Sequence, residues 1–329
     1  MKFETVLDFY IYYLEILLKR EKNHTKVVPF SEIANKVEVF NNSIEIVQGT
    51  HSNMLFSRSE FNYNVVHMLY SLSGRTDSYI LKKYKSSYWR YSNEGFYVNT
   101  IGERLYTLYG NQIKRCVNFL KENIYTSDAV CFMKSFENEN IECTLNLHFY
   151  YRDNRLNLEL SYKGSSLLEY TNSDLFIYSS LLSLMSHWLD VEPGSLFLKC
   201  HSIFISENDL ERAKKLLEIG KSLRNIGISM NHRFSSSIET YRSEFSEAIN
   251  RIIAWDTVDI TQRVSEELEY IKKYFTPYIQ DLLLILLADR FHQTDSDYKI
   301  VLSQLSDRSI GKFKETIDKI QFNKLLEVI

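Results

Sequence analysis

The sequence CTLNLHFYYRDNRLNLELSY runs from Cys143 to Tyr162 and predicts a β-hairpin. Residues 156–162 alternate strictly between apolar and polar side chains, as a strand does when one of its faces is buried. The apolar run at 143–151 precedes them, and the polar residues at 152–155 lie between the two segments. Two strand-like segments joined by a short polar turn are typical of a hairpin, so we expect antiparallel pairing here.

Apolar periodicity on both sides of this hairpin predicts an α+β body followed by a helical tail. The expected helices of the body span 3–20, 62–72, 112–122 and 175–189, with strand-like runs at 28–60, 129–133 and 196–205. From about Asn208 the pattern is helical to the end, with segments at 235–255, 264–291, 297–305 and 312–328. Ser206 is expected to cap the first of these helices. We therefore expect an α+β domain over 1–235 and a helical C-terminal domain over 236–329.

Size and charge limit the classes of function. The chain has 329 residues, of which 44% are hydrophobic and 25% charged, which is ordinary for a globular protein with a large core. Its formal net charge of −3 gives no reason to expect a nucleic-acid partner, which would require a basic surface. The small basic cluster Lys82-Lys83-Tyr84-Lys85 is interpreted as a solvated face.

The cysteines and the apolar runs point to a cytoplasmic protein. Cys116, Cys131, Cys143 and Cys200 form no C-x-x-C pair, and no secretory signal is visible, so we expect free thiols in a reducing compartment. The longest apolar run, 282–288, is too short to span a bilayer, so no membrane association is expected. No metal is expected either, because neighbouring side chains such as those at 200 and 201 point to opposite faces of a strand.

The hairpin sequence also resembles a known family. Residues 142–153, ECTLNLHFYYRD, are similar to the nucleophile strand of the thymidylate synthase superfamily, which reads roughly P-C-T-L-x-L-Q-F-x-x-R-D. Further similar segments follow the family's order and spacing, so that the resemblance covers about residues 60–225. They are 68–74, 89–95, 99–105, 112–120, 156–174 and 194–209.

This resemblance implies a fold and a chemistry. The implied fold is a thymidylate-synthase-like α+β domain, a mostly antiparallel sheet with covering helices, here followed by an all-helical C-terminal extension. The implied ligand is a pyrimidine nucleotide or nucleoside, with a reduced folate as the implied one-carbon donor. Family members are symmetric homodimers, and the resemblance implies the same for this chain.

Five residues fall on positions that carry roles in the family. Cys143 stands at the nucleophile, which attacks C6 of the pyrimidine and activates C5. Lys163 replaces a phosphate-binding arginine, His148 replaces a glutamine, and His67 replaces the catalytic glutamate and is a candidate for handling protons. Asp174 replaces the asparagine that reads uracil. A carboxylate accepts hydrogen bonds from an exocyclic amine, as in the related deoxycytidylate hydroxymethylases, so the resemblance leans toward cytosine.

Other family positions are changed. The arginine pair that reaches a partner's phosphate site falls on Ser127 and Asp128, and the H-x-Y pair falls on Ser202 and Phe204. The tyrosine of the family's YG pair falls on Ile101. These changes argue against the ordinary thymidylate synthase reaction, because they remove charge-assisted hydrogen bonds to the substrate.

Two functional hypotheses remain open, and each candidate residue also has a structural interpretation. The chain either performs altered C5 one-carbon transfer through Cys143, or is a catalytically inactive nucleotide sensor or interaction module whose helical C-terminal domain binds a protein partner. Cys143 can equally be a small core residue, His67 a buried structural histidine and Asp174 a helix cap, whereas His148 can simply fill space. Thiol reactivity and ligand binding distinguish these alternatives.

Overall fold

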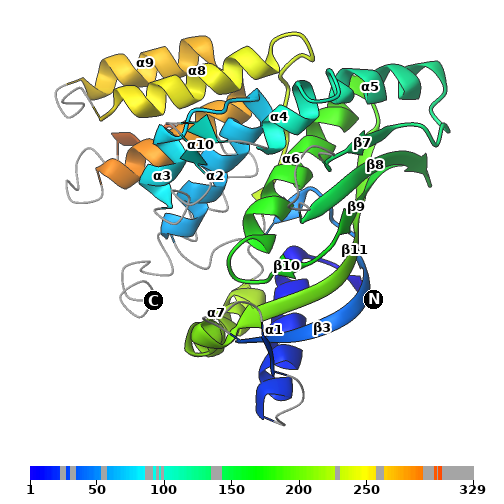
Figure 1. Cartoon of the computed structure of the whole chain (residues 1–329). Helices are drawn as coiled ribbons and strands as arrows, with labels where there is room; N and C mark the ends of the chain where they lie inside the picture. The colour runs from blue at the N-terminus through cyan, green and yellow to red at the C-terminus, as the bar shows by residue number, and fades with distance from the viewer. Residues whose placement is uncertain are drawn as a thin grey trace.

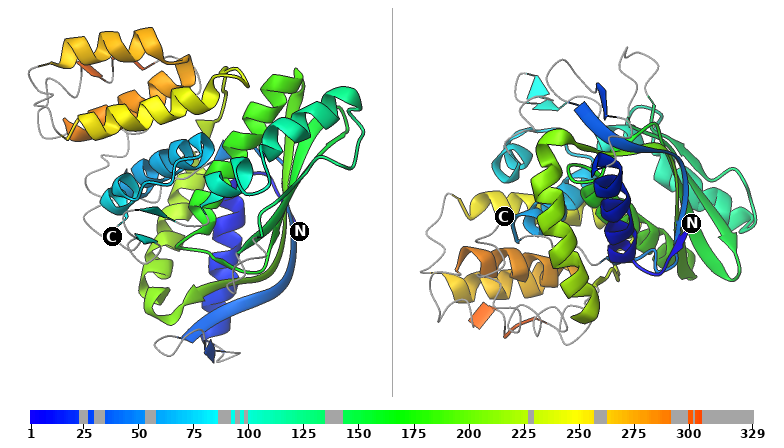
Figure 2. Two further views of the ribbon diagram at one scale, coloured as in Figure 1. Left: turned by 45° about the horizontal axis from the view of Figure 1, so that its top comes forward. Right: turned by 90° about the horizontal axis from the view of Figure 1, so that it is seen from below.

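A curved β-sheet carries helices on its concave face (Figures 1 and 2). The computed structural model describes the residues 1–22, 27–29, 35–52, 58–85, 92–93, 96–97, 100–134, 143–226, 230–256, 263–291, 300–301 and 303–305. Within these residues the protein is α+β with a mostly antiparallel open sheet, as the sequence predicts. None of the helices in this part of the chain is both long enough and apolar enough to cross a membrane.

The main sheet has the strand order β1-β3-β11-β9-β8-β7, with β10 added to β11 and β2 to β3. Their bounds are Lys2–Phe3 (β1), Val27–Pro29 (β2), Asn35–Ile46 (β3), Val130–Phe132 (β7), Thr144–Arg152 (β8), Arg155–Tyr162 (β9), Ser165–Ser166 (β10) and Glu192–Ser206 (β11). The pairs β7–β8, β8–β9, β3–β11 and β2–β3 are antiparallel, and β9–β11, β1–β3 and β10–β11 are parallel. The parallel β9–β11 pair requires a crossover, and α6 (Thr171–Leu189) provides it.

The predicted hairpin is present. Strands β8 and β9 pair antiparallel and meet at Asp153 and Asn154, whose φ angles are 55° and 60°. Two consecutive positive φ angles are the hallmark of the tight hairpin turn whose twist matches that of the strands, and Asp and Asn tolerate them better than most residues. The side chains of Leu147 and Phe149 are fully buried on the helix-covered face.

The remaining helices agree with the predicted ones in most places. They are α1 (Val6–Lys22), α2 (Arg58–Ser73), α3 (Tyr79–Tyr84), α4 (Ile101–Tyr106), α5 (Gln112–Glu122), α7 (Leu210–Ile226), α8 (Tyr241–Ala254), α9 (Val264–Tyr274) and α10 (Pro277–Arg290). Ser206 accepts a hydrogen bond from the Asn208 N–H at 3.3 Å and so caps the 3₁₀ turn Glu207–Asp209 before α7. The predicted helix at 312–328 lies outside the described residues, and of the one at 297–305 only 300–301, which are helical, and 303–305 are described.

Two expectations need correction. The segment after 208 is not helical throughout, because Met230–Asn231 (β12) pairs with His51–Ser52 (β4) as a short second sheet. The helix expected from 235 begins only at Tyr241, after a turn at 238–240. A third small sheet pairs Ser92–Asn93 (β5) with Phe96–Tyr97 (β6).

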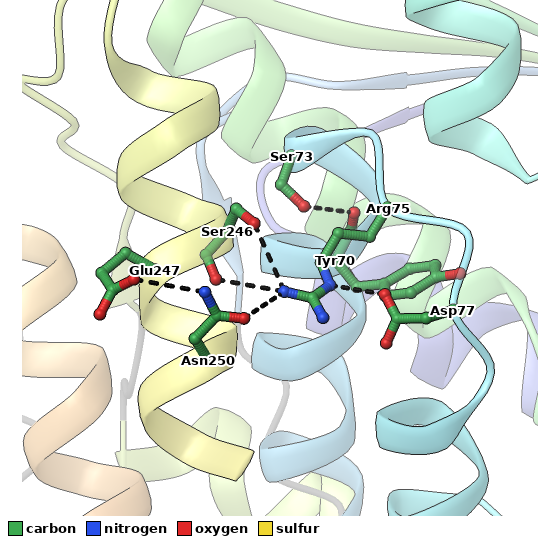
Figure 3. A network of polar contacts seen from close by, with 7 residues as sticks. All are labelled: Tyr70, Ser73, Arg75, Asp77, Ser246, Glu247 and Asn250. Carbon is green, nitrogen blue, oxygen red and sulfur yellow. Dashed lines mark hydrogen bonds and ion pairs between the residues drawn. The ribbon is translucent and has the colours of Figure 1, made fainter. Parts of the chain in front are cut away.

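The C-terminal helices pack on the body. The Arg75 side chain, just beyond α2, donates to Asn250 Oδ1 on α8 at 2.6 Å and to Asp77 Oδ1 at 2.6 Å (Figure 3). It also lies 3.4 Å from the carbonyl oxygen of Ser246. A single cluster of buried apolar side chains extends from α1 through the sheet and α2 to α8, α9 and α10. In the described residues, the segment after 235 therefore shares its core with the segment before it.

Candidate functional site

The start of β8 and the end of β9 bring Cys143 and Lys163 together. Cys143 immediately precedes β8 and is exposed, and its carbonyl accepts a hydrogen bond from the Lys163 N–H at 2.8 Å. The β-hairpin dictates this arrangement, because antiparallel pairing places the first residues of one strand opposite the last residues of the other. Two sequence-predicted site residues thus lie side by side.

A row of buried side chains extends across the sheet from the start of β8, next to Cys143. Thr144, Tyr162 and Cys200 are neighbours in register across β8, β9 and β11, and all three are buried. The Tyr178 hydroxyl on α6 donates to Thr144 Oγ1 at 3.3 Å. Asp174 lies one turn earlier on the same helix, so α6 positions its carboxyl beside the start of β8.

The Asp174 carboxyl has an unusual ionisation. Burial raises its pKa to about 7, and the nearby cations Lys85 and Arg104 reverse only part of this effect. Its side chain keeps partial exposure, and in the described residues no side chain donates a hydrogen bond to it. A carboxyl with a pKa near neutrality, whose charge acts on the same buried Tyr162 as the exposed Cys143, is a functional-site candidate.

His67 lies on α2, on the other side of the same interior. The side chain is 6% exposed, and burial, with a smaller effect from Lys85, lowers its pKa to about 3. The Tyr63 hydroxyl lies 3.0 Å from His67 Nδ1, within hydrogen-bond distance. The imidazole is therefore neutral at physiological pH, and a group with so low a pKa is a weak proton acceptor.

Lys85 interacts electrostatically with both His67 and Asp174, although the sequence alone did not indicate a role for it. Its ammonium donates to the carbonyl of Glu169 at 2.7 Å and lies 5.1 Å from the Tyr63 ring and 5.0 Å from the Tyr170 ring. Burial lowers the pKa of Lys85, and its charge acts on both His67 and Asp174. The interpretation of the 82–85 cluster as a solvated face therefore does not hold for Lys85, which is half-buried.

Helices α1, α2 and α7 lie on one side of this region. An ion pair joins α7 to α2. The Arg212 guanidinium on α7 pairs with the Glu60 carboxylate at the start of α2. Burial raises the pKa of Tyr10 on α1, and the charges of Glu60 and Asp174 add to this effect. We refer to His67, Lys85, Cys143 and Asp174 as the polar cluster.

His148 is not part of the polar cluster. It lies on β8 opposite Glu159, on the face of the sheet that points away from the buried Leu147 and Phe149. Its ring packs at 5.5 Å from that of Tyr150 on this outer face, and its Nε2 atom has no hydrogen-bond partner in the described part of the chain. Of the five predicted site residues, Cys143 and Lys163 are joined by a backbone hydrogen bond, His67 and Asp174 both feel the charge of Lys85, and His148 lies on the outer face.

Metal ligands and known relatives add no further constraint. Across the described ranges, no group of three or more His, Cys, Asp and Glu side chains is arranged to hold a metal ion. No protein-family profile matches the chain, and no curated protein sequence matches it either. The polar cluster is therefore the basis for the proposed function.

Proposed function

We propose that the protein is thymidylate-synthase-like and acts on a cytosine-type pyrimidine nucleotide or nucleoside, with Cys143 as the nucleophile. The observation that supports the proposal is that the exposed Cys143 and the buried Asp174, whose pKa is raised, both act electrostatically on Tyr162, the residue opposite Thr144 at the start of β8. The family resemblance assigns these two positions to attack and to base reading, and the fold brings both to the start of β8.

Asp174 is suited to the cytosine edge for a specific reason. Cytosine presents an acceptor, N3, beside a donor, the N4 amine. A protonated carboxyl has one O–H donor and one carbonyl acceptor, so it can bond to both at once, whereas a carboxylate can only accept. Because the pKa of Asp174 is about 7, the protonated form is available near neutral pH. Uracil, with an N3–H donor and an O4 acceptor, is better matched by the amide of asparagine.

The proposed step at Cys143 is a reversible addition. The thiolate attacks C6, the C5–C6 π electrons move to C5, and C5 takes up an electrophile. Loss of the C5 proton then returns the electron pair, and the C6–Sγ bond breaks. The attack requires the thiolate form of Cys143, and the charge of Lys163, whose N–H bonds to the Cys143 carbonyl, is proposed to favour that form.

His67 of the polar cluster and the adjacent Lys163 are proposed to hold the ligand. Neutral His67 serves as a hydrogen-bonding group beside Tyr63, and Lys163 is the proposed contact for a phosphate where the ligand carries one. A reduced folate as donor and a symmetric homodimer rest on the resemblance. No described side chain is assigned to a folate, and no step is derived through one.

Exchange of the C5 hydrogen tests the proposal without any donor. The protein is incubated in D₂O with deoxycytidine, dCMP and dUMP, and the loss of the H5 proton signal is followed by NMR. We expect exchange on a cytosine compound, no exchange with Cys143→Ala, and slower exchange on cytosine with Asp174→Asn. Cys200→Ala, at the buried neighbouring thiol, is the matched control and should retain exchange. Absence of exchange on every pyrimidine would contradict the catalytic proposal.

The alternative function is a catalytically inactive nucleotide sensor, and one observation favours it. The cations nearest the polar cluster already interact with protein groups, Arg212 with Glu60 and Lys85 with the Glu169 carbonyl, so fewer are available for a phosphate. A protein of this kind would bind a pyrimidine without C5 exchange, and the helices after 235 would carry the protein partner. Binding without exchange would therefore select this alternative.

A further inference from the structure

A cavity lies at the far end of α6 from Asp174. Its volume is about 500 Å³, and its lining includes Ser186 and His187 from the last turns of α6. Asp174 and Ser186 are twelve residues apart on one helix, which corresponds to about 18 Å along the axis. The cavity is therefore distinct from the polar cluster, and the inference drawn from it is independent of the proposed function.

The closed side of the cavity is built by close backbone packing. Gly49, after β3, donates its N–H to the carbonyl of Gly194 in β11 at 3.2 Å. A Cβ atom on Gly49 would lie 2.7 Å from that same oxygen, so a larger residue would force the two segments apart. The lining also includes Thr50, His232 and Phe234, which are all buried.

A buried hydroxyl in the lining lacks a partner. Three serines lie on α6 in this region, and two are satisfied by protein atoms. Ser180 Oγ lies 2.9 Å from His232 Nδ1, and Ser183 Oγ donates to the His232 carbonyl at 2.7 Å. Ser186 is only 2% exposed, and its Oγ has no hydrogen-bond partner in the described residues. Because buried polar groups are normally hydrogen-bonded, this hydroxyl is suited to donate to a ligand in the cavity.

The mouth of the cavity carries an excess of positive charge. Arg155 and Arg233 both line it and are exposed, and neither guanidinium forms an ion pair or side-chain hydrogen bond in the part of the chain that the structure describes. Glu192 is the only carboxylate among the lining residues. Arginine presents paired N–H donors that match two oxygens of a phosphate, so two unengaged guanidiniums beside a free hydroxyl favour a phosphate group.

We propose that this cavity is a binding site for a small organic phosphate of up to mononucleotide size. Arg155 and Arg233 hold the phosphate, the Ser186 hydroxyl donates to one of its oxygens, and the uncharged part of the ligand lies against Phe234 and His232. The volume falls within the usual range of small-molecule sites.

Isothermal titration of the full chain tests this site. The probes are inorganic pyrophosphate, AMP and adenosine at constant ionic strength. We expect AMP and pyrophosphate to bind and adenosine to bind far more weakly. Arg155→Gln and Arg233→Gln should each weaken binding of AMP by about tenfold or more, and Ser186→Ala should weaken it by severalfold.

The control is Arg152→Gln, three residues from Arg155 in the same hairpin. Arg152 is exposed and donates to the carbonyl of Tyr151 at 2.5 Å, outside the cavity lining. Its substitution should leave the affinity for AMP within about twofold of wild type. The proposal is overturned if neither probe phosphate binds at millimolar concentration, or if Arg152→Gln weakens binding as much as Arg155→Gln and Arg233→Gln do. Unchanged melting temperatures confirm that the variants are folded.

Discussion

Asp174 is the residue whose chemistry the fold changes most. On the surface its carboxyl would be fully ionised at neutral pH, but the helix α6 carries it into the interior and burial raises its pKa to about 7. The opposite shift occurs at His67, where burial lowers the pKa to about 3. Both shifts have one cause, since burial disfavours the charged form of either group. Near neutral pH His67 is therefore uncharged and Asp174 is only partly ionised, and Lys85 provides the positive charge nearby.

The raised pKa of Asp174 predicts a pH-dependent stability. Between its ordinary value of 3.8 and the folded value of about 7, the folded state binds more protons than the unfolded state, so this group's contribution to stability is lost as pH rises through that window. Asp174→Asn removes the effect. Relative to wild type, the variant should gain at least about 1 kcal/mol of unfolding free energy between pH 4 and pH 8, as measured by urea denaturation.

Asp289→Asn is the matched control, because it makes the same change from carboxylate to amide at a different place in the fold. The Asp289 carboxylate accepts a hydrogen bond from Asn62 Nδ2 at 2.7 Å near the other end of the helical region. If Asp174→Asn and wild type keep the same stability difference at both pH values, the Asp174 carboxyl is ionised in the folded state and the argument for cytosine reading loses its basis.

Some residues of the polar cluster could be predicted from the sequence, and others could not. Cys143 and Asp174 were reached only through the family resemblance, because a lone cysteine and an aspartate near a helix start have no distinctive local pattern. Lys85 was missed because a run of lysines has the same appearance whether its members are solvated or, as here, one of them packs between two aromatic rings. The placement of His148 on the outer face depends on the bulge between Thr144 and Asn146, which the sequence pattern does not reveal.

At the element scale, the hairpin was predictable and the short strands were not. The alternation at 156–162 and the polar residues at 152–155 determine β9 and its turn, since side chains of a strand alternate between faces. The strand Met230–Asn231 has only two residues, too few for any periodicity, and it forms through its pairing with His51–Ser52. Tertiary contact rather than local preference explains it.

The turn of the hairpin supports a prediction at this scale. Asn154 has a φ of 60°, in the left-handed region that glycine adopts freely and β-branched residues avoid. Asn154→Val should lower the free energy of unfolding by about 1–2 kcal/mol, while Asn154→Gly should leave it unchanged or slightly higher. Urea denaturation monitored by circular dichroism measures both variants. Equal stability of Val and Gly at this position would contradict the assigned turn.

For the molecule as a whole, the sequence predicted a boundary near 235, and the described residues on its two sides share a core. The contacts that join them are far apart in the chain. Arg75 meets Asn250 across 175 residues (Figure 3), and Arg242 Nε donates to the carbonyl of Ser73 at 3.2 Å. Such contacts have no local signature, so composition and periodicity cannot predict them.

Loss of the Arg75 side chain should therefore destabilise the whole protein. Arg75→Ala removes the bonds to Asn250 and Asp77 and leaves their oxygens without this donor. We expect a loss of about 1–3 kcal/mol in unfolding free energy, with a single transition seen by both fluorescence and circular dichroism. Arg263→Ala, at an exposed arginine before α9, should have little effect. Two separate transitions in wild type would show instead that the segments before and after 235 unfold independently.

The most direct test of the central claim is the rate of Cys143 alkylation with and without a pyrimidine. Cys143 is the exposed cysteine, whereas Cys116, Cys131 and Cys200 are buried, so iodoacetamide at neutral pH should modify Cys143 first, as read by peptide mass spectrometry. We predict that deoxycytidine or dCMP slows this modification, that dUMP does so less, and that Asp174→Asn removes the difference. Modification of Cys143 at one rate in all conditions would contradict a pyrimidine site at the polar cluster.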